Sequence, residues 1–252
     1  MNNSAEHSYA ASPGSVVEIA ARIRSGATTP SDVVQGYLER IAAVDGAVQA
    51  WVSVDESGAL AAASEMTKEA ANGAFRGPLH GVPVAIKDIC DVAGWPTRCN
   101  SATRANAENA TADADIVASL RNAGAIVLGK THTTEFAYYD PSPARNPHNI
   151  NHTPGGSSSG SGAAMGAGMT PAAIGTQTVA SVNRPAAYCG VSAFKPSTRS
   201  LSAYGVAPLA PMYDTPGLYG WGVEDAVALY NAVCPPHSQA VELRSADARI
   251  VV

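Results

Sequence analysis

The feature that most constrains the fold of this chain is a run of very small side chains at residues 155–168, which reads GGSSSGSGAAMGAG. A helix built from such residues has little side chain of its own to bury, so it is stabilised only by lying very close to a neighbouring element. A flexible Gly/Ser linker is the alternative interpretation, but ordered-looking segments flank the run. We therefore expect a helix at about residues 163–168 that packs tightly against a sheet.

The segments before this run indicate a parallel sheet. Residues 81–86 are apolar and partly β-branched, as is typical of a buried strand. A helical segment that begins at Thr111 or Asp113 and ends at Asn122 follows, and residues 124–131 have the pattern of a second strand. Strand, helix and strand in this order favour a right-handed crossover. The predicted fold class is α/β, with a mixed, largely parallel sheet covered by helices.

Amphipathic helices account for most of the remaining pattern. Helical spacing of apolar residues predicts four of them, and a Pro/Asn/His-rich loop is expected at 140–156. These helices are expected at residues 15–24, 30–44, 58–72 and 223–233. Residues 248–252 look like the opening of another strand. No linker or repeat divides the chain, so we expect residues 1–252 to form one domain, incomplete at its C-terminus.

Charge and composition exclude several classes of function. The formal net charge is −5, so composition gives no reason to bind nucleic acid or an acidic membrane. No apolar run approaches the roughly 20 residues of a membrane span, and the N-terminus lacks a secretory pattern. We expect a cytoplasmic protein with reduced cysteines, a disulfide between Cys90 and Cys99 being the alternative. Without CxxC or HExxH spacing, no metal site is predicted.

Ser181 is the first candidate for chemistry. A serine hydroxyl attacks a carbonyl only when a base removes its proton, and the resulting oxyanion needs N–H donors. The backbone of Thr178, Val179, Ala180 and Ser181 supplies such amides if the chain turns sharply there. The alternative is a turn serine that caps a helix.

Lys87 is the candidate base. It ends an apolar strand, where burial favours the neutral amine and lowers the pKa of the side chain. Two structural interpretations compete with this one. Lys87 is either the first solvated residue after a buried strand, or an ion-pair partner of Asp88.

Three other patterns fit catalysis less well. Residues 156–160, Gly-x-Ser-x-Gly, have the spacing of a nucleophile elbow, but a polar segment precedes them instead of a strand. Residues 192–195, Ser-x-x-Lys, require a helix, which Pro196 opposes. His132 or His148 could complete a Ser–His–Asp triad, although nothing in the sequence singles them out.

Taken together, three blocks resemble the amidase signature family. They are GVPVAIKD around Lys87, GGSSSGSGAAMGAGM around Ser157, and GTQTVASVNRPAAYCGVSAFKPS around Ser181. The intervening GKTHTTEFAY and RNPHNINHTPGG are similar to the family as well, and the resemblance runs from about Ile19 to Asp225. It implies hydrolysis of a small-molecule carboxylic amide to an acid and ammonia or an amine, without cofactor or metal.

The resemblance also implies roles for individual residues. Ser181 corresponds to the acylated nucleophile, and Ser157 to a serine that follows a cis peptide bond and relays a proton to Lys87. The amides of residues 178–181 correspond to the oxyanion hole. Val179 and Ala180 stand where the family usually has glycine, and a turn that required positive φ there would be strained by about 1–2 kcal/mol.

Family members are commonly longer than this chain, which leaves two alternatives open. One is a catalytically dead fragment or pseudoenzyme that acts as a binding module through its sheet edge. The other is the ammonia-producing chain of an amidotransferase, its A chain, which passes ammonia to an acyl acceptor. In either case a homo-oligomer or a partner chain could complete the sheet.

Overall fold

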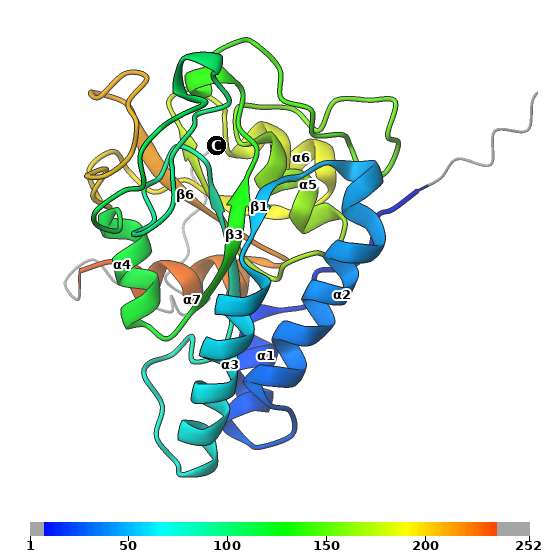
Figure 1. Cartoon of the computed structure of the whole chain (residues 1–252), viewed down its shortest axis with the longest axis vertical. Helices are drawn as coiled ribbons and strands as arrows, with labels where there is room; N and C mark the ends of the chain where they lie inside the picture. Colours follow the sequence, from blue (N-terminus) through cyan, green and yellow to red (C-terminus); the bar gives the residue numbers. More distant parts are fainter. Residues whose placement is uncertain (1–7, 236–252) are drawn as a thin grey trace, which may run out of the picture.

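The computed structural model describes residues 8–235, in which six strands form one sheet with helices on both faces (Figure 1). In chain order the strands are β1 (Trp51–Val54), β2 (Pro83–Lys87), β3 (Ile126–Thr131), β4 (Ala173–Gln177), β5 (Ser192–Phe194) and β6 (Thr215–Gly220). Their spatial order is β1-β3-β2-β4-β6-β5. The three central strands β3, β2 and β4 are parallel, β1 and β6 are antiparallel to their inner neighbours, and β5 is antiparallel to β6. The predicted α/β class with a mixed sheet is confirmed, and the parallel pairings are the two at the centre of the sheet.

The helices of the described residues are α1 (Val16–Arg24), α2 (Pro30–Val48), α3 (Glu56–Ala71), α4 (Asp115–Asn122), α5 (Ser159–Gly166), α6 (Asn183–Cys189) and α7 (Val223–Val233). All except α6 lie close to a helix that the sequence predicts, although α5 begins four residues before its expected start at residue 163. Short 3₁₀ turns occupy Ala102–Arg104 and Glu135–Ala137. The side chains of Ser15 and Thr29 accept hydrogen bonds from the first turns of α1 and α2, as N-cap residues do. The strand expected at 248–252 lies outside the described residues.

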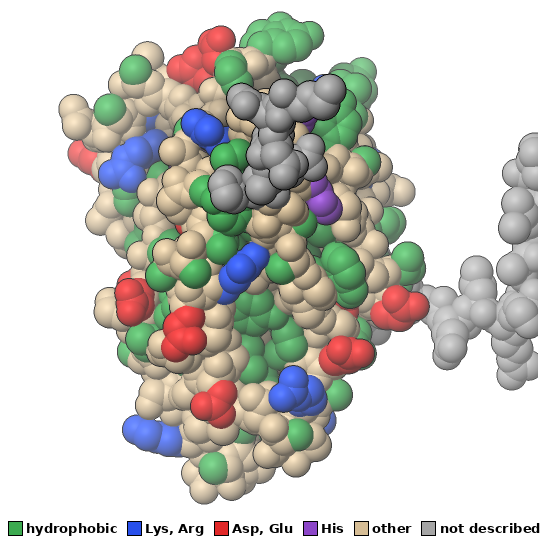
Figure 2. Space-filling model, turned by 90° about the vertical axis from the view of Figure 1, so that its right-hand side faces the viewer, with side chains coloured by type: hydrophobic (Ala, Val, Ile, Leu, Met, Phe, Trp, Pro, Cys, Tyr) green, Lys and Arg blue, Asp and Glu red, His purple; other side chains and the backbone are tan. Residues whose placement is uncertain are grey.

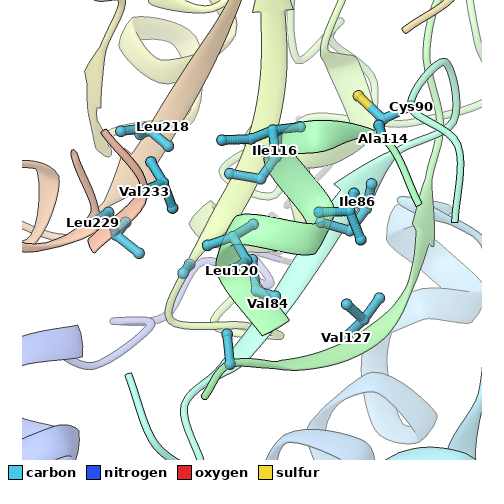
Figure 3. Packing of buried hydrophobic residues seen from close by; sticks show 14 of the residues in the cluster. Val84, Ile86, Cys90, Ala114, Ile116, Leu120, Val127, Leu218, Leu229 and Val233 are labelled. Atoms are coloured by element: carbon cyan, nitrogen blue, oxygen red, sulfur yellow. The ribbon is translucent and has the colours of Figure 1, made fainter. Parts of the chain in front are cut away.

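The core divides between the two faces of the sheet. Along β2, Val84 and Ile86 belong to one cluster of buried apolar residues, whereas Ala85 belongs to the other, because side chains alternate along a strand. The first cluster contains residues of α1, α4 and α7. Figure 3 shows side chains of α4 beside those of β2, and side chains of α7 beside Leu218 of β6. The second contains residues of α2, α3, α5 and α6. The sheet is therefore the middle of three layers.

Helix α5 confirms the tight packing that its small residues predict. All eight of its residues are buried. A Cβ atom on Gly160 would lie 2.3 Å from the carbonyl oxygen of Ala50, and one on Gly162 would lie 2.8 Å from Cβ of Pro185. Neither position has room for a side chain, so α5 can lie this close to the sheet and to α6 only with glycine there. This packing places the residues just before α5 at the carboxyl ends of β2 and β4.

The surface carries charges of both signs. On the face in Figure 2, acidic and basic side chains are interspersed among apolar and uncharged ones. Within residues 8–235, no helix combines the length and the apolar character needed to cross a membrane. Cys90, Cys99, Cys189 and Cys234 are buried free thiols.

Candidate active site

Lys87 lies at the carboxyl end of β2, and its side chain is fully buried. Its Nζ atom lies 2.8 Å from Oγ of Ser157 and 2.9 Å from Oγ1 of Thr176, which is in β4. The parallel pairing of β2 with β4 brings the two strand ends together, and the segment before α5 supplies the serine. A lysine head group is thus held inside the protein by two hydroxyl groups.

Burial lowers the pKa of Lys87 to about 7, because removing the ammonium from water disfavours its charged form. Cys90, Asp214 and Cys99 oppose this effect only in part. Neither competing interpretation of Lys87 fits the structure. The side chain is not solvated, and Asp88 forms its ion pair with Lys130 instead, at 3.0 Å.

Ser157 lies two residues before the start of α5 and is also buried. The Gly156–Ser157 peptide bond is cis. The carbonyl oxygen of Ser157 accepts a hydrogen bond of 3.0 Å from the amide of Thr134. The serine is therefore fixed by its backbone as well as by the contact with Lys87.

Ser181 lies in the turn between β4 and α6 and is half-buried. Its carbonyl oxygen accepts a hydrogen bond of 3.1 Å from the amide of Ser158, which places its backbone beside the residue that follows Ser157. Helix α6 has Val182 at its N-cap and no side-chain capping bond. The alternative interpretation of Ser181, a helix-capping serine, is therefore wrong.

The amides of residues 178–181 make no hydrogen bond to the described part of the protein, residues 8–235. The side chain of Gln177 accepts from the amides of Val182 and Asn183, at 2.8 and 2.9 Å, and so fixes the turn at its far end. Val179 and Ala180 do not have positive φ, so the strain that a side chain would suffer in that conformation does not arise. The side chain of Val179 is 86% exposed.

A cavity of about 490 Å³ lies over these elements, and residues 178–181 and Gly156 form part of its lining. Tyr138, Tyr139 and Tyr188 line it as well. Among the lining residues in the described part of the chain, Arg184 alone is charged. Its Nε and Nη2 atoms donate to the carbonyl oxygen of Gly156 at 2.9 and 2.7 Å. The cavity is thus mostly uncharged, with one cation beside the serine-bearing segment.

Sequence reasoning missed two residues of this arrangement. Thr176 is the second partner of Lys87, and Asp214 accepts a hydrogen bond from the side chain of Thr178. Thr176 lies within the block around Ser181 that resembles the family but was given no role there, and Asp214 lies outside the blocks that carry the resemblance. The signal that could have found Thr176 is its polar side chain near the end of the buried strand AIGTQ.

The weaker patterns found in the sequence do not form sites. No strand directly precedes Ser158, and residues 192–195 begin with a strand rather than a helix, so both patterns are excluded as expected. Nε2 of His148 lies 3.0 Å from the carbonyl oxygen of Cys189, and Nδ1 of His132 has no hydrogen-bond partner among residues 8–235. Residues 8–235 contain no group of His, Cys, Asp or Glu side chains that could hold a metal ion.

Known proteins resemble this chain in sequence and in fold. A family model described as Amidase matches residues 32–247. The A chain of the glutamyl-tRNA(Gln) amidotransferase of Acidothermus cellulolyticus is 40% identical over 223 residues, which are 86% of this chain and 44% of the relative. The peptide amidase of Stenotrophomonas maltophilia superposes with a TM-score of 0.81 at 35% identity, over 92% of this chain and 49% of the amidase.

A further solved structure has a TM-score of 0.84 at 36% identity, covering 88% of this chain and 50% of its own. It is described as a vestigial protein complex that reveals the evolutionary origins of an s-triazine catabolic enzyme. The chain therefore spans about half the length of the relatives it matches.

Proposed function

The chain belongs to the amidase family, and on this premise we propose that it cleaves a carboxylic amide to an acid and ammonia or an amine through an acyl-enzyme on Ser181. The observation that carries the proposal is the buried contact between Lys87 and Ser157, in which a lysine with a pKa of about 7 lies 2.8 Å from a serine hydroxyl. Near neutral pH about half of such lysines are neutral and able to accept a proton.

In the proposed reaction, Ser181 Oγ attacks the carbonyl carbon of the amide while its proton passes to Ser157 and the proton of Ser157 passes to Lys87. The tetrahedral oxyanion that forms accepts hydrogen bonds from the amides of residues 178–181. The carbon–nitrogen bond then breaks, and the leaving nitrogen takes the proton back through the same relay. Water attacks the resulting ester through the relay in the same way, which releases the acid and restores Ser181.

Thr176 has a supporting role in this proposal. A neutral lysine has two N–H donors and one lone pair, and the lone pair must face Ser157 for proton transfer. The bond of 2.9 Å from Lys87 to Oγ1 of Thr176 occupies one donor and so directs the lone pair toward the serine. The side chain of Thr176 is itself buried, which keeps water from competing for that donor.

A second candidate function is that of an amidotransferase A chain, which hands ammonia to an acyl acceptor. The name of the A. cellulolyticus relative favours it. The chain matches only about half of the length of its relatives. A partner chain or a second copy of this chain is therefore a further possible component of the sheet, whether the assembly is catalytic or acts as a binding module. For either function we propose that the chain forms one domain, because the two core clusters pack on opposite faces of the same sheet.

Ammonia release from a panel of primary amides tests the proposal. We expect the chain to release ammonia alone, and the Ser181→Ala, Ser157→Ala and Lys87→Met variants to release none above the buffer rate. Release that requires glutamine and an added partner chain would favour the amidotransferase role. If folded protein releases no ammonia from any amide in either setting, the binding module is the better description.

A further inference from the structure

Asp214 connects two segments that border the cavity. It lies just before β6 and is half-buried. One carboxylate oxygen accepts a hydrogen bond from the hydroxyl of Thr178, and the other accepts from the amides of Leu209 and Ala210, each at 2.8 Å. Thr178 begins the turn at residues 178–181, and both Thr178 and Leu209 line the cavity.

This carboxylate has no neutralising partner. Within residues 8–235, no lysine, arginine or histidine forms an ion pair with Asp214. Three hydrogen-bond donors satisfy its two oxygens instead, two from the 209–210 backbone and one from Thr178. Such charge-assisted bonds are roughly twice as strong as bonds between neutral groups, so Asp214 joins the two segments through three strong hydrogen bonds.

We propose that Asp214 is a positioning residue for the amidase reaction, which fixes the turn at residues 178–181 through Thr178 and joins it to the cavity wall at Leu209. The inference rests on the proposed function, because it assigns these amides to the oxyanion. A displacement of about 1 Å at a reacting centre can cost on the order of 100-fold in rate. A residue that holds the turn without touching the substrate is therefore expected to act on turnover more than on substrate affinity.

The charge of Asp214 gives the proposal a second, independent signature. Three titratable groups raise the pKa of Lys87 against the effect of burial, namely Cys90, Asp214 and Cys99. Burial raises the pKa values of the two thiols to about 12 and about 11, so both are uncharged near neutral pH. Asp88, next to Lys87 in the chain, is paired with Lys130. Removing the charge of Asp214 therefore lowers the pKa of Lys87 further.

Two variants of the full chain separate these effects. Asp214→Asn removes the charge but keeps the size of the side chain, and Thr178→Val removes the hydroxyl but leaves the charge in place. Hydrogen exchange followed by mass spectrometry measures the exchange rates of two pairs of amides. The first pair is Leu209 and Ala210, and the second is Val182 and Asn183, which donate hydrogen bonds to Gln177 and not to Asp214. The rate of Ser181 modification by a sulfonyl fluoride, measured from pH 5 to pH 9, reports the reactivity of the serine.

We expect Asp214→Asn to speed exchange at both pairs of amides by about tenfold or more, and Thr178→Val to speed it at Val182 and Asn183 alone. Both variants should lower the modification rate by about 10- to 100-fold. Asp214→Asn alone should shift the acid limb of the pH profile to lower pH, because neutral Lys87 then persists further into the acid range.

Unchanged exchange at Val182 and Asn183 in both variants would overturn the proposal, and so would a rate loss in Asp214→Asn that Thr178→Val does not share. The hydrogen-exchange measurement does not depend on the reactivity of Ser181. If the parent chain is never modified at Ser181, the proposed function fails, whereas the exchange data still decide whether Asp214 positions the turn.

Discussion

The pKa of Lys87 makes the pH dependence of Ser181 reactivity a sharp prediction. In the proposed relay only neutral Lys87 accepts the proton that leaves Ser181 through Ser157, so the rate of modification should follow the neutral fraction of this one side chain. Burial lowers the pKa of Lys87 from 10.5 to about 7. The rate should therefore rise with pH and reach a plateau within the physiological range.

The magnitude follows from that pKa. With a midpoint near pH 7, the neutral fraction is about 0.9 at pH 8, about 0.1 at pH 6 and about 0.01 at pH 5. We expect the modification rate to fall about tenfold from pH 8 to pH 6 and about 90-fold from pH 8 to pH 5. A lysine with its ordinary pKa would instead give a rate that still rises about tenfold per unit between pH 7 and pH 9.

Intact mass spectrometry supplies the assay. The protein is mixed with phenylmethylsulfonyl fluoride at each pH, and the adduct is counted over time, with Ser181→Ala as the background. Reagent hydrolysis is followed in parallel and divided out. A midpoint above pH 9, or a rate without any acid limb on a protein that remains folded, would refute the assignment of Lys87 as the base.

Three further outcomes follow from the same contacts. Thr176→Val, which removes an acceptor from Lys87, should slow Ser181 modification about tenfold while Thr176→Ser restores it; equal rates in all three proteins would show that this bond does not orient the lysine. Because the folded protein disfavours charged Lys87, the unfolded state binds more protons than the folded state above pH 7. The free energy of unfolding, measured by urea denaturation, should therefore rise by about 1.5 kcal/mol from pH 7 to pH 8.5. Lys87→Met lacks the titrating group and should show no such rise, and the same dependence on pH in both proteins would count against the low pKa. Arg184, the charged residue of the cavity lining, should favour a substrate that carries a carboxylate, so Arg184→Met should lower the ratio of kcat/KM for succinic acid monoamide over butanamide by about tenfold; an unchanged ratio would place Arg184 outside substrate recognition.

The sequence predicts those parts of the site that depend on local pattern. Lys87 ends an apolar strand, and its side chain is buried, as one of the interpretations of that position predicts. The small residues at 155–168 require close packing, and α5 is buried throughout. The cis bond before Ser157 is expected only from the family resemblance, because nothing in the residues themselves specifies it.

The remaining parts depend on long-range pairing. Thr176 meets Lys87 because β4 pairs with β2, and the two residues are 89 positions apart in the chain. Strand β6, TPGLYG, contains proline and glycine, which local propensity places outside the interior of a sheet. It nevertheless lies between β4 and β5. Asp214 owes its place to that strand, so no local pattern could connect it with Thr178.

The central claim is that Ser181, Ser157 and Lys87 act as one catalytic unit on an amide. Its most direct test is the intact mass of the chain after treatment with a serine-reactive fluorophosphonate, compared with the Ser181→Ala, Ser157→Ala and Lys87→Met variants at pH 8. The account predicts a single adduct on Ser181 of the parent chain and none on the three variants, each shown to be folded. An adduct that persists in Ser181→Ala, or equal labelling of the Lys87→Met variant, would contradict it.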